Sequence, residues 1–307
     1  MEITKRKIRI VLSYLAYPFC IANYFRRALE RRDDVELFTL GAFTNQYIPW
    51  NGGMQIPMKY LNQVDLPLAP SINHPSWEMI EPQLPWKPDL SLTVDADWHF
   101  MNKPKCLHAH VATDPHVLNY DRPRAYSDYF FNMQKCYSKP GDIYLPYAFD
   151  PGCHYPIDIP KEYDACLIGL HYPQRDEWVR RLKEKGISVN YRIGDIYDEY
   201  REENAKATIG LNWSSLEDVN ARVFEIMAMG LVPVINRLPD LSLLGFVENE
   251  HYLGFSDMDE AVSKVIWAKE NPAKVALIAL YAMTKVISDD MTYYNRIETI
   301  LKTVGLI

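Results

Sequence analysis

Apolar positions in the first forty residues follow strand-like and helix-like spacings in turn. Lys7–Tyr14 is a short apolar run typical of a buried strand, and Phe19–Arg32 repeats apolar residues at helical spacing. Val35–Leu40 predicts a second strand, so we expect the chain to open with a strand–helix–strand unit. The start resembles a secretory signal peptide only superficially, because Arg9 interrupts the apolar run.

The pattern becomes irregular between residues 41 and 88. This stretch holds eight of the 21 prolines and the turn-like sequence Asn51-Gly-Gly. An irregular segment of this length is uncommon inside a compact domain unless it has a function. Two interpretations remain open, an acceptor-binding insertion or a surface segment that packs on its domain.

Strand patterns return after residue 88 and continue to the middle of the chain. The expected strands are Asp89–Val94, Lys105–Val111 and Ser127–Asn132, and the segment Ile143–Phe149 closes this half. Residues 150–160 are rich in proline and other turn-forming residues, so they are expected to link two domains.

The second half of the chain alternates strands and helices more regularly. The expected strands are Tyr163–Ile168, Ser188–Arg192, Thr208–Trp213 and Leu231–Ile235. The expected helices are Gln174–Lys185, Tyr197–Lys206, Ala221–Met229, Met258–Lys269, Ala273–Ile287 and Met291–Thr303. Such alternation is typical of a parallel sheet with helices on both faces.

These patterns predict an α/β protein built from two doubly wound, Rossmann-like domains. The N-terminal domain is expected to comprise residues 1–150 and the C-terminal domain residues 151–307. In open parallel sheets, ligands bind outside the carboxyl ends of the strands. We therefore expect the two domains to face each other across a cleft lined by strand ends.

Composition narrows the class of protein further. Apolar residues make up 48 % of the 307 residues, which indicates a globular fold rather than disorder. The net charge of −7, without a long basic run, argues against a surface for duplex DNA. Five cysteines without a Cys-x-x-Cys pair predict a reduced, cytoplasmic protein. No apolar run reaches the length of a transmembrane helix.

The most specific chemistry in the sequence surrounds the predicted helix Ala221–Met229. Two carboxylates, Glu217 and Glu225, are separated by seven residues, and the second lies within this helix. Asn220 is a favourable N-cap for the helix, and Gly230 is a favourable residue directly after its end.

The start of that helix is expected to bind a diphosphate. Unpaired N–H groups and the helix dipole favour an anion there, and the groups concerned belong to Ala221, Arg222 and Val223. The Arg222 side chain can add a charged hydrogen bond. Glu225 can accept hydrogen bonds from ribose hydroxyls, and Glu217 can reach the donor sugar. A solvated Glu217 and a capping Glu225 are the structural alternatives.

Further candidates for donor binding lie at the ends of neighbouring strands. Gly169 lets the backbone approach a ligand, and Arg175, near the next helix start, is placed to hold a phosphate. Tyr191 can stack on a nucleobase or belong to the core. The remaining candidates for donor binding are His171, Arg192 and Asn212.

Four segments, in this order, resemble the C-terminal domain of GT-B glycosyltransferases: Tyr163–Arg175, Ile209–Asn212, Asn220–Gly230 and Met291–Arg296. The branch most similar to them is the spore-maturation-protein (Cge-type) family, which is related to the glycosyl transferases group 1. Two segments of the first half also resemble this family, namely Ala112–His116 and Tyr144–Pro156.

This resemblance implies a GT-B architecture whose last helix can return to the N-terminal domain. The C-terminal domain would bind a nucleotide sugar, with a UDP-sugar expected, and the N-terminal domain would bind a hydroxyl acceptor without an obligatory metal. Glu225 would bind the ribose and Glu217 the sugar. The chain is shorter than usual for this fold, and Glu217 lacks the glycine-rich setting of the retaining enzymes.

The acceptor-side candidates lie in and after one strand of the first half. Cys106, His108 and His110 alternate on one strand face and are ligand types suited to zinc. Three residues along one strand are nevertheless too spread to bind one ion unaided. Asp114 and His116 follow the strand end and are expected in the cleft, where a histidine can act as a base or orient the sugar.

We expect no metal and no cofactor besides the nucleotide sugar that serves as donor. Asp95-Ala-Asp97 matches a metal-binding pattern of the other major glycosyltransferase fold, but turn-forming aspartates are the more ordinary explanation. The catalytic candidates are Asp114, His116 and Glu217.

The predicted activity is transfer of a sugar from a nucleotide-diphosphate sugar to a hydroxyl of a glycan, a cell-surface polymer or a small molecule. Retention at the anomeric carbon follows from the resemblance alone. Glycosylation of a modified DNA base is an alternative, as is a catalytically silent nucleotide-sugar-binding partner of another transferase. A nicotinamide-dependent dehydrogenase is disfavoured, because the first strand–helix turn lacks the Gly-x-Gly-x-x-Gly sequence.

Overall fold

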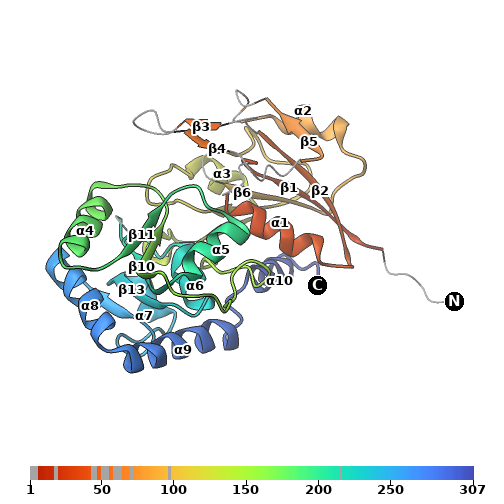
Figure 1. Ribbon diagram of the computed structural model, residues 1–307. Helices are drawn as coiled ribbons and strands as arrows, with labels where there is room; N and C mark the ends of the chain where they lie inside the picture. Colours follow the sequence, from red (N-terminus) through yellow and green to blue (C-terminus); the bar gives the residue numbers. More distant parts are fainter. Residues whose placement is uncertain are drawn as a thin grey trace. The chain divides into compact units, whose positions relative to one another are not determined.

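The chain forms two compact units, each built around a parallel sheet (Figure 1). The computed structural model describes residues 6–16, 20–42, 47–49, 55–57, 64–69, 72, 74–95, 98–214 and 216–307. The first unit comprises Met1–Pro146 and Tyr293–Ile307, and the second comprises Tyr147–Thr292. In the described part of the chain, no helix is both long enough and apolar enough to span a membrane.

The sheet of the first unit has seven strands in the order β5-β2-β1-β6-β7-β8-β9, and all of its pairings are parallel. Strand β1, in the interior of this sheet, buries Ile10, Val11 and Leu12 completely, as expected for a sheet covered on both faces. The strands are β1 (Ile8–Ser13), β2 (Val35–Ala42), β5 (Leu66–Leu68), β6 (Leu90–Asp95), β7 (Leu107–Ala112), β8 (Tyr129–Asn132) and β9 (Ile143–Tyr144).

Short helices connect the strands of the first unit. They are α1 (Ala22–Glu30), α2 (Trp77–Ile80) and α3 (Asp121–Tyr126), with the 3₁₀ turns η1 (Glu81–Gln83) and η2 (Lys135–Tyr137). The predicted first helix is confirmed in its central part, while Phe19 lies outside the described residues.

The described part of the stretch between residues 41 and 88 contains strands and a helix that the sequence pattern does not predict. Strand β5 pairs with β2, and the hairpin strands β3 (Tyr47–Pro49) and β4 (Gln55–Pro57) pair with each other. In α2, Trp77 and Ile80 are buried in a core cluster with Trp98. The described part of this stretch therefore includes a packed segment of the domain, and its elements are too short to give a clear periodic pattern.

The C-terminal helix α10 (Tyr293–Thr303) completes the first unit by packing against α1. Tyr293 is fully buried, and its ring stacks on Tyr24 with the ring centroids 5.2 Å apart. Glu298 forms an ion pair with Arg32 at 2.7 Å. The end of the chain is thus a structural part of the unit that contains its beginning.

The second unit contains a five-stranded parallel sheet in the order β11-β10-β12-β13-β14. Alternate residues of β10 face opposite sides: Ala165 and Leu167 join one core cluster, while Cys166 and Ile168 join the other. The strands are β10 (Tyr163–Ile168), β11 (Val189–Arg192), β12 (Ala207–Asn212), β13 (Val232–Asn236) and β14 (Leu253–Phe255).

Helices follow the strands of this sheet in the regular alternation that the sequence predicts. They are α4 (Pro173–Glu184), α5 (Tyr197–Ala205), α6 (Ala221–Ala228), α7 (Pro239–Leu243), α8 (Met258–Glu270) and α9 (Pro272–Ser288). The predicted α/β class with two Rossmann-like domains is confirmed. The sequence pattern does not predict β14 and α7, which are three and five residues long.

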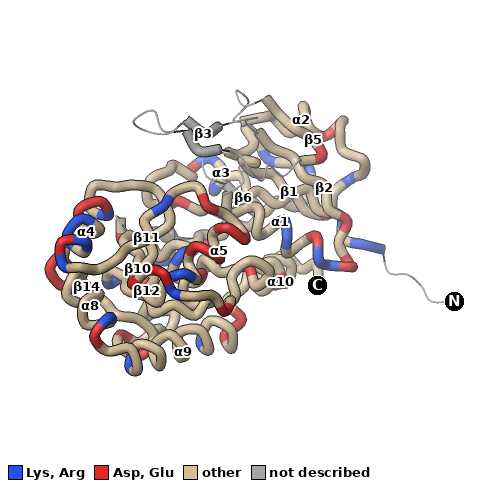
Figure 2. Tube along the Cα trace, in the orientation of Figure 1, with Lys and Arg blue, Asp and Glu red and all other residues tan. Residues whose placement is uncertain are grey.

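Figure 2 shows charged residues of both signs along α4. On that helix, Glu177 forms ion pairs with Arg180 and Arg181, both at 2.7 Å. The charges of Arg180 and Arg181 are therefore largely neutralised within their own helix.

Candidate functional site

The candidate site of the second unit lies where the parallel strands end. Gly169 follows β10, Asn212 ends β12 and Asn236 ends β13, so three loops begin at the same edge of the sheet. Helix α6 starts at that edge after the loop that leaves β12. The strand order thus gathers the predicted donor-binding residues around the start of one helix.

Arg222, in the first turn of α6, extends over Gly169. Its Nη1 donates a hydrogen bond to Asn212 Oδ1 at 3.1 Å. A Cβ atom on Gly169 would lie 2.0 Å from Arg222 Nη2, and Gly169 has a φ of +152°, which side chains rarely adopt. The absence of a side chain at residue 169 is therefore what makes room for the guanidinium.

Arg175 is buried beside Arg222. Its Nε and Nη2 donate to the carbonyl of Trp213 at 3.2 and 2.9 Å, and its Nη1 donates to the carbonyl of Leu170 at 2.9 Å. Burial, together with the charge of Arg222, lowers the pKa of Arg175 to about 10. Arg175 thus fastens two strand-end loops to each other and also brings a second positive charge to the site.

Neither of these two arginines forms an ion pair with a carboxylate among the described residues. Arg222 Nε is buried without a hydrogen-bond partner there. Two neighbouring guanidinium groups that form no ion pair create a local positive potential next to a helix N-terminus. Such a place favours a bound anion.

Asn220 occupies the N-cap position of α6 in an extended conformation, but its side chain does not cap the helix. The expectation of a capping side chain was wrong, because Asn220 Nδ2 instead donates to Asn212 Oδ1 at 3.2 Å and to Ser214 Oγ at 3.0 Å. The N–H groups of Ala221 and Arg222 are therefore not occupied by this side chain. The expectation that the Val223 N–H is unpaired was wrong, because it donates to the Asn220 carbonyl at 3.2 Å.

Ser214 and Asn236 belong to the site, and the sequence analysis missed both. Ser214 N donates to Asn236 Oδ1 at 2.9 Å, and Asn236 Nδ2 donates to the Ser214 carbonyl at 3.0 Å. This exchange fixes the loop after β12, which carries the Ser214 hydroxyl that accepts from Asn220. An asparagine at the end of the next strand was the signal that could have revealed it.

Glu225 lies on the same side of α6 as Arg222, one turn further along. The two side chains do not form an ion pair, and Glu225 Oε1 instead lies 3.7 Å from His154 Nε2. The buried hydroxyl of Tyr200 also faces Glu225, and burial together with this carboxylate raises the pKa of the Tyr200 phenol. The helix therefore presents a cation at its first turn and a separate carboxylate at its second.

His171 and Tyr191 form a stacked pair at the ends of β10 and β11, with ring centroids 4.1 Å apart. Tyr191 donates its hydroxyl to Asp176 Oδ1 at 2.7 Å. Arg192, also predicted to bind the donor, forms a bidentate pair with Asp195 at 2.6 and 2.9 Å. The charge of Arg192 is thus compensated within the protein, unlike those of the two arginines above.

Glu217 lies in the loop before α6 and is exposed. Its φ of +60° places it in the left-handed region, which is costly for a residue with a Cβ atom. The two glutamates therefore occupy different settings, an exposed loop for Glu217 and a buried helix face for Glu225.

The acceptor-side candidates belong to the first unit. Asp114 is half-buried after β7 and accepts a hydrogen bond from the Thr113 hydroxyl at 3.0 Å. His116 follows it and packs against Tyr137, with ring centroids 5.6 Å apart. These residues lie at the carboxyl end of a parallel strand, the position where such sheets bind ligands.

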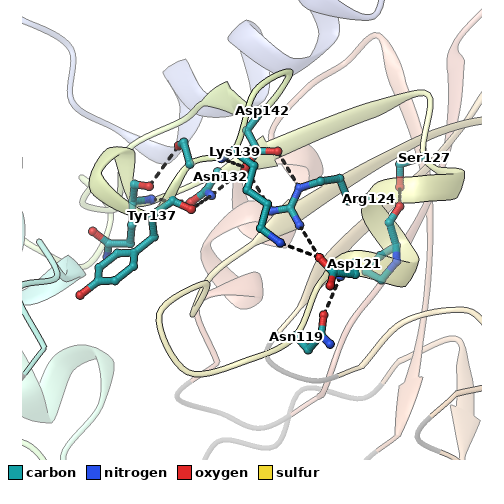
Figure 3. A network of polar contacts seen from close by, with 11 residues as sticks. Asn119, Asp121, Arg124, Ser127, Asn132, Tyr137, Lys139 and Asp142 are labelled. Carbon is teal, nitrogen blue, oxygen red and sulfur yellow. Dashed lines mark hydrogen bonds and ion pairs between the residues drawn. The ribbon is translucent and has the colours of Figure 1, made fainter.

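A polar network holds the loop that carries Tyr137 (Figure 3). The buried Asp142 carboxylate accepts from Arg124 Nε at 2.7 Å and from Asn132 Nδ2 at 3.0 Å. Asn132 Nδ2 also donates to the Tyr137 carbonyl at 3.3 Å. These bonds hold the pKa of Asp142 below its usual range against the opposing effect of burial. The network anchors one side of the acceptor candidates.

The histidine strand of the first unit is interior. His108 and His110 are fully buried in β7, and burial raises the pKa of the Cys106 thiol to about 12, which disfavours the thiolate that binds metals. Across the residues that the structure describes, no group of His, Cys, Asp or Glu is arranged to hold a metal ion. Asp97 of the Asp95-Ala-Asp97 sequence lies outside those residues.

Two Rossmann-like domains with seven- and five-stranded parallel sheets define the GT-B fold, which solved structures match over nearly the whole chain. A glycosyltransferase from Rickettsia africae ESF-5 has a TM-score of 0.63 at 9 % identity, over 98 % of each chain. Anabaena Alr3699/HepE, solved in complex with UDP-glucose, has a TM-score of 0.61 at 11 % identity, over 97 % of this chain and all of its own. A UDP-N-acetylglucosamine 2-epimerase has a TM-score of 0.56 at 10 % identity, over 98 % of each chain.

Residues 155–302 match the family described as "Glycosyl transferase-like", which covers just under half of the chain and most of the second unit. No curated protein matches the sequence. The predicted GT-B fold is confirmed, and the similarity to the spore-maturation-protein branch stays a prediction. Because an epimerase shares the fold, the choice of activity depends on the chemistry of the site.

Proposed function

We propose that the protein is a glycosyltransferase that moves a sugar from a nucleotide-diphosphate sugar to a hydroxyl acceptor. The observation that carries this proposal is the pair Arg175 and Arg222, which has no carboxylate partner among the described residues beside the start of α6. A diphosphate has the charge and size to occupy such a site. The glycosyl transferase-like match of residues 155–302 supports the same assignment.

In the proposed reaction, negative charge develops on the leaving diphosphate as the bond to the sugar breaks. Arg222 and the first N–H groups of α6 would stabilise that charge, and Arg175 would reinforce it from behind. Glu225 would accept hydrogen bonds from the ribose hydroxyls and so fix the nucleotide relative to the arginines. Glu217 is the proposed contact to the donor sugar.

The acceptor hydroxyl is proposed to approach Asp114 and His116, one of which would remove its proton. The sugar carbon would then lose the bond to the phosphate oxygen and gain a bond to the acceptor oxygen on the same face of the sugar, through an oxocarbenium-like transition state. Neither step requires a metal ion, because the arginines and the helix start supply positive charge. We propose a UDP-sugar as the donor and retention at the anomeric carbon as the outcome.

The test is a thermal-shift panel of UDP-, GDP- and dTDP-sugars on the wild type, on Glu225→Ala and on Glu202→Ala. Glu202 is an exposed glutamate of α5 and serves as the matched control. A ligand at 100 times its Kd stabilises the folded state by about 2.7 kcal/mol. We expect one donor to raise the melting temperature of the wild type and of the control and to lose most of that effect in Glu225→Ala. An equal shift in all three proteins would overturn the proposal.

A second assay separates transfer from mere binding. Slow hydrolysis of the bound donor, or transfer to a hydroxyl acceptor, is expected of an enzyme. A catalytically silent nucleotide-sugar-binding protein would give the thermal shift without either reaction. Conversion of the sugar to its epimer would assign the site to the other activity that this fold supports.

A further inference from the structure

Glu225 is held in a small buried cluster that comes from three parts of the second unit. Its carboxylate is about nine-tenths buried, and no Arg or Lys among the described residues lies within ion-pair distance. A buried carboxylate without a cation is costly unless other groups donate hydrogen bonds to it. The groups that face it belong to His154, in the turn before β10, and Tyr200, in α5.

The hydrogen bonds of His154 determine which of its ring nitrogens carries the proton. His154 Nδ1 accepts a hydrogen bond from the Asp150 backbone N–H at 3.1 Å. In the neutral ring the proton must then be on Nε2, which is the atom 3.7 Å from Glu225 Oε1. His154 therefore directs a donor at the carboxylate.

The turn that carries His154 is fixed to the helix that carries Tyr200. Cys153 N and His154 N both donate to the Asp150 carbonyl, at 2.9 and 2.8 Å, which closes a tight turn. Arg201 Nη1, from α5, donates to the Cys153 carbonyl at 3.2 Å. The His154 and Tyr200 rings meet edge to face, with centroids 5.9 Å apart. The two donors are thus locked to each other before any ligand binds.

The three side chains of the cluster lie close together, but their polar atoms are not within hydrogen-bond distance. The buried Tyr200 hydroxyl makes no hydrogen bond within the usual limit, and the distance from His154 to Glu225 exceeds a hydrogen bond. Polar contacts in a ligand-binding site are often long in the free protein and shorten when the ligand is in place. A ribose that pulls Glu225 into position would bring both donors within bonding distance.

We propose that His154 and Tyr200 are positioning residues that aim the Glu225 carboxylate at the ribose hydroxyls of the nucleotide. This assignment rests on the proposed function, since it needs Glu225 to bind a ribose. It adds two residues to the donor site that contact the nucleotide only through Glu225. It also gives the turn between residues 150 and 156 a role in binding rather than in linking alone.

The experiment measures the affinities of the variants for UDP and for 2′,3′-dideoxy-UDP, which lacks both ribose hydroxyls. Asparagine places its side-chain oxygen near the position of His Nδ1, and glutamine places its amide nitrogen near Nε2. His154→Asn therefore keeps the bond from Asp150 but removes the donor facing Glu225, whereas His154→Gln restores that donor. Tyr200→Phe removes the phenol hydroxyl alone.

We expect His154→Asn and Tyr200→Phe each to weaken UDP binding about tenfold and to leave the affinity for dideoxy-UDP unchanged. His154→Gln should bind UDP within about threefold of the wild type. A purely structural role would weaken both ligands equally and would not be rescued by glutamine.

Two results would overturn the assignment in distinguishable ways. If Glu225→Ala loses the preference for UDP over dideoxy-UDP while His154→Asn and Tyr200→Phe retain it, the positioning role is wrong and the donor site stands. If wild type and Glu225→Ala show the same preference between the two nucleotides, Glu225 does not recognise the ribose. The positioning role of His154 and Tyr200 is then wrong as well.

Discussion

At the scale of single residues, we expect the addition of one methyl group at Gly169 to weaken ligand binding at the candidate site strongly. Gly169→Ala would force the added Cβ to within 2.0 Å of Arg222 Nη2, so the guanidinium must move away from the strand end. We expect affinity for the nucleotide sugar to fall about tenfold or more, measured by isothermal titration calorimetry.

The matched control for this substitution is Gly186→Ala. Gly186 also has a positive φ, +75°, but a Cβ there would meet nothing within 4 Å. Both variants carry a backbone cost of about 1–2 kcal/mol, so a loss of binding caused by strain alone would appear in both. Equal affinities for the two variants would contradict the role given to Arg222.

His108 should make the stability of the first unit depend on pH. Burial, together with neighbouring His110, lowers the pKa of His108 to about 3, against about 6.5 in an unfolded chain. Because the pKa is lower in the folded state, the contribution of His108 to the free energy of unfolding is complete above pH 6.5. It is lost as the pH falls towards 3, by about 1.4 kcal/mol per pH unit. Urea unfolding at several pH values measures that slope.

A variant that cannot titrate provides the comparison. His108 Nδ1 lies 3.1 Å from the Ser91 carbonyl, so it is the protonated nitrogen. His108→Asn keeps a donor near that position and removes the titrating group. We expect its stability to depend less steeply on pH between 6 and 4. An unchanged slope would show that other groups control the acid response.

The positions of the predicted site residues follow from the sequence where a side chain is close in sequence to the element that carries it. Gly169, Arg175 and Arg222 are gathered at one sheet edge, as strand ends followed by a helix start imply. His154 and Tyr200 could not be predicted, because they reach Glu225 from segments far apart in the sequence. Their roles follow only from packing.

At the scale of elements, the site depends on how closely α6 lies over β12. Gly210 makes this approach possible, because a Cβ there would lie 2.4 Å from Ile226 Cγ2 and 2.9 Å from its Cγ1. Gly210→Ala should push α6 away from the sheet and cost about 1–3 kcal/mol in the free energy of unfolding. It should also weaken donor binding, since Arg222 and Glu225 move with the helix.

A double-mutant cycle tests whether that contact is the cause. Ile226→Ala removes the atoms that the new Cβ would meet, at its own cavity cost of about 2–5 kcal/mol. If the helix approach is decisive, Gly210→Ala should cost much less in the Ile226→Ala background. If the two changes in the free energy of unfolding simply add in chemical denaturation, the strain of Gly210→Ala does not come from Ile226.

Element boundaries were predicted best where the apolar pattern is long and ends in a clear signal. Helix α6 ends before Gly230, whose φ of +75° and bonded N–H mark the helix end that the sequence indicates. Short elements such as α2 and β14 offer too few turns or alternations to reveal a period.

At the scale of the whole molecule, the chain crosses from one unit to the other and returns. Helix α10 belongs to the first unit although it follows the second in sequence. Tyr293→Ala should therefore destabilise the first unit by about 3–5 kcal/mol, because the fully buried ring packs on Tyr24 and Phe25.

Hydrogen exchange followed by mass spectrometry measures this effect element by element. We expect faster exchange in α1 and β1 of the Tyr293→Ala variant, while the core strands β10 and β12 of the second unit keep their protection. Uniformly faster exchange in both units would mean that they unfold as one and that the division at Pro146 and Thr292 has no energetic meaning.

The overall architecture was predictable because strand–helix alternation leaves few topologies for a chain of this length. The two parallel sheets follow from that alternation, whereas the GT-B fold was predicted from the family resemblance. The activity was harder to predict, since proteins of this fold include an epimerase as well as transferases. Deciding between them requires the positions of individual charges at the strand ends.

The most direct test is a crystal structure of the protein with its nucleotide sugar bound. Diphosphate oxygens are predicted within hydrogen-bond distance of Arg222 and of the first N–H groups of α6, with the ribose hydroxyls on Glu225. A nucleotide bound elsewhere, or a ribose that leaves Glu225 untouched while Arg222 faces solvent, would contradict the account.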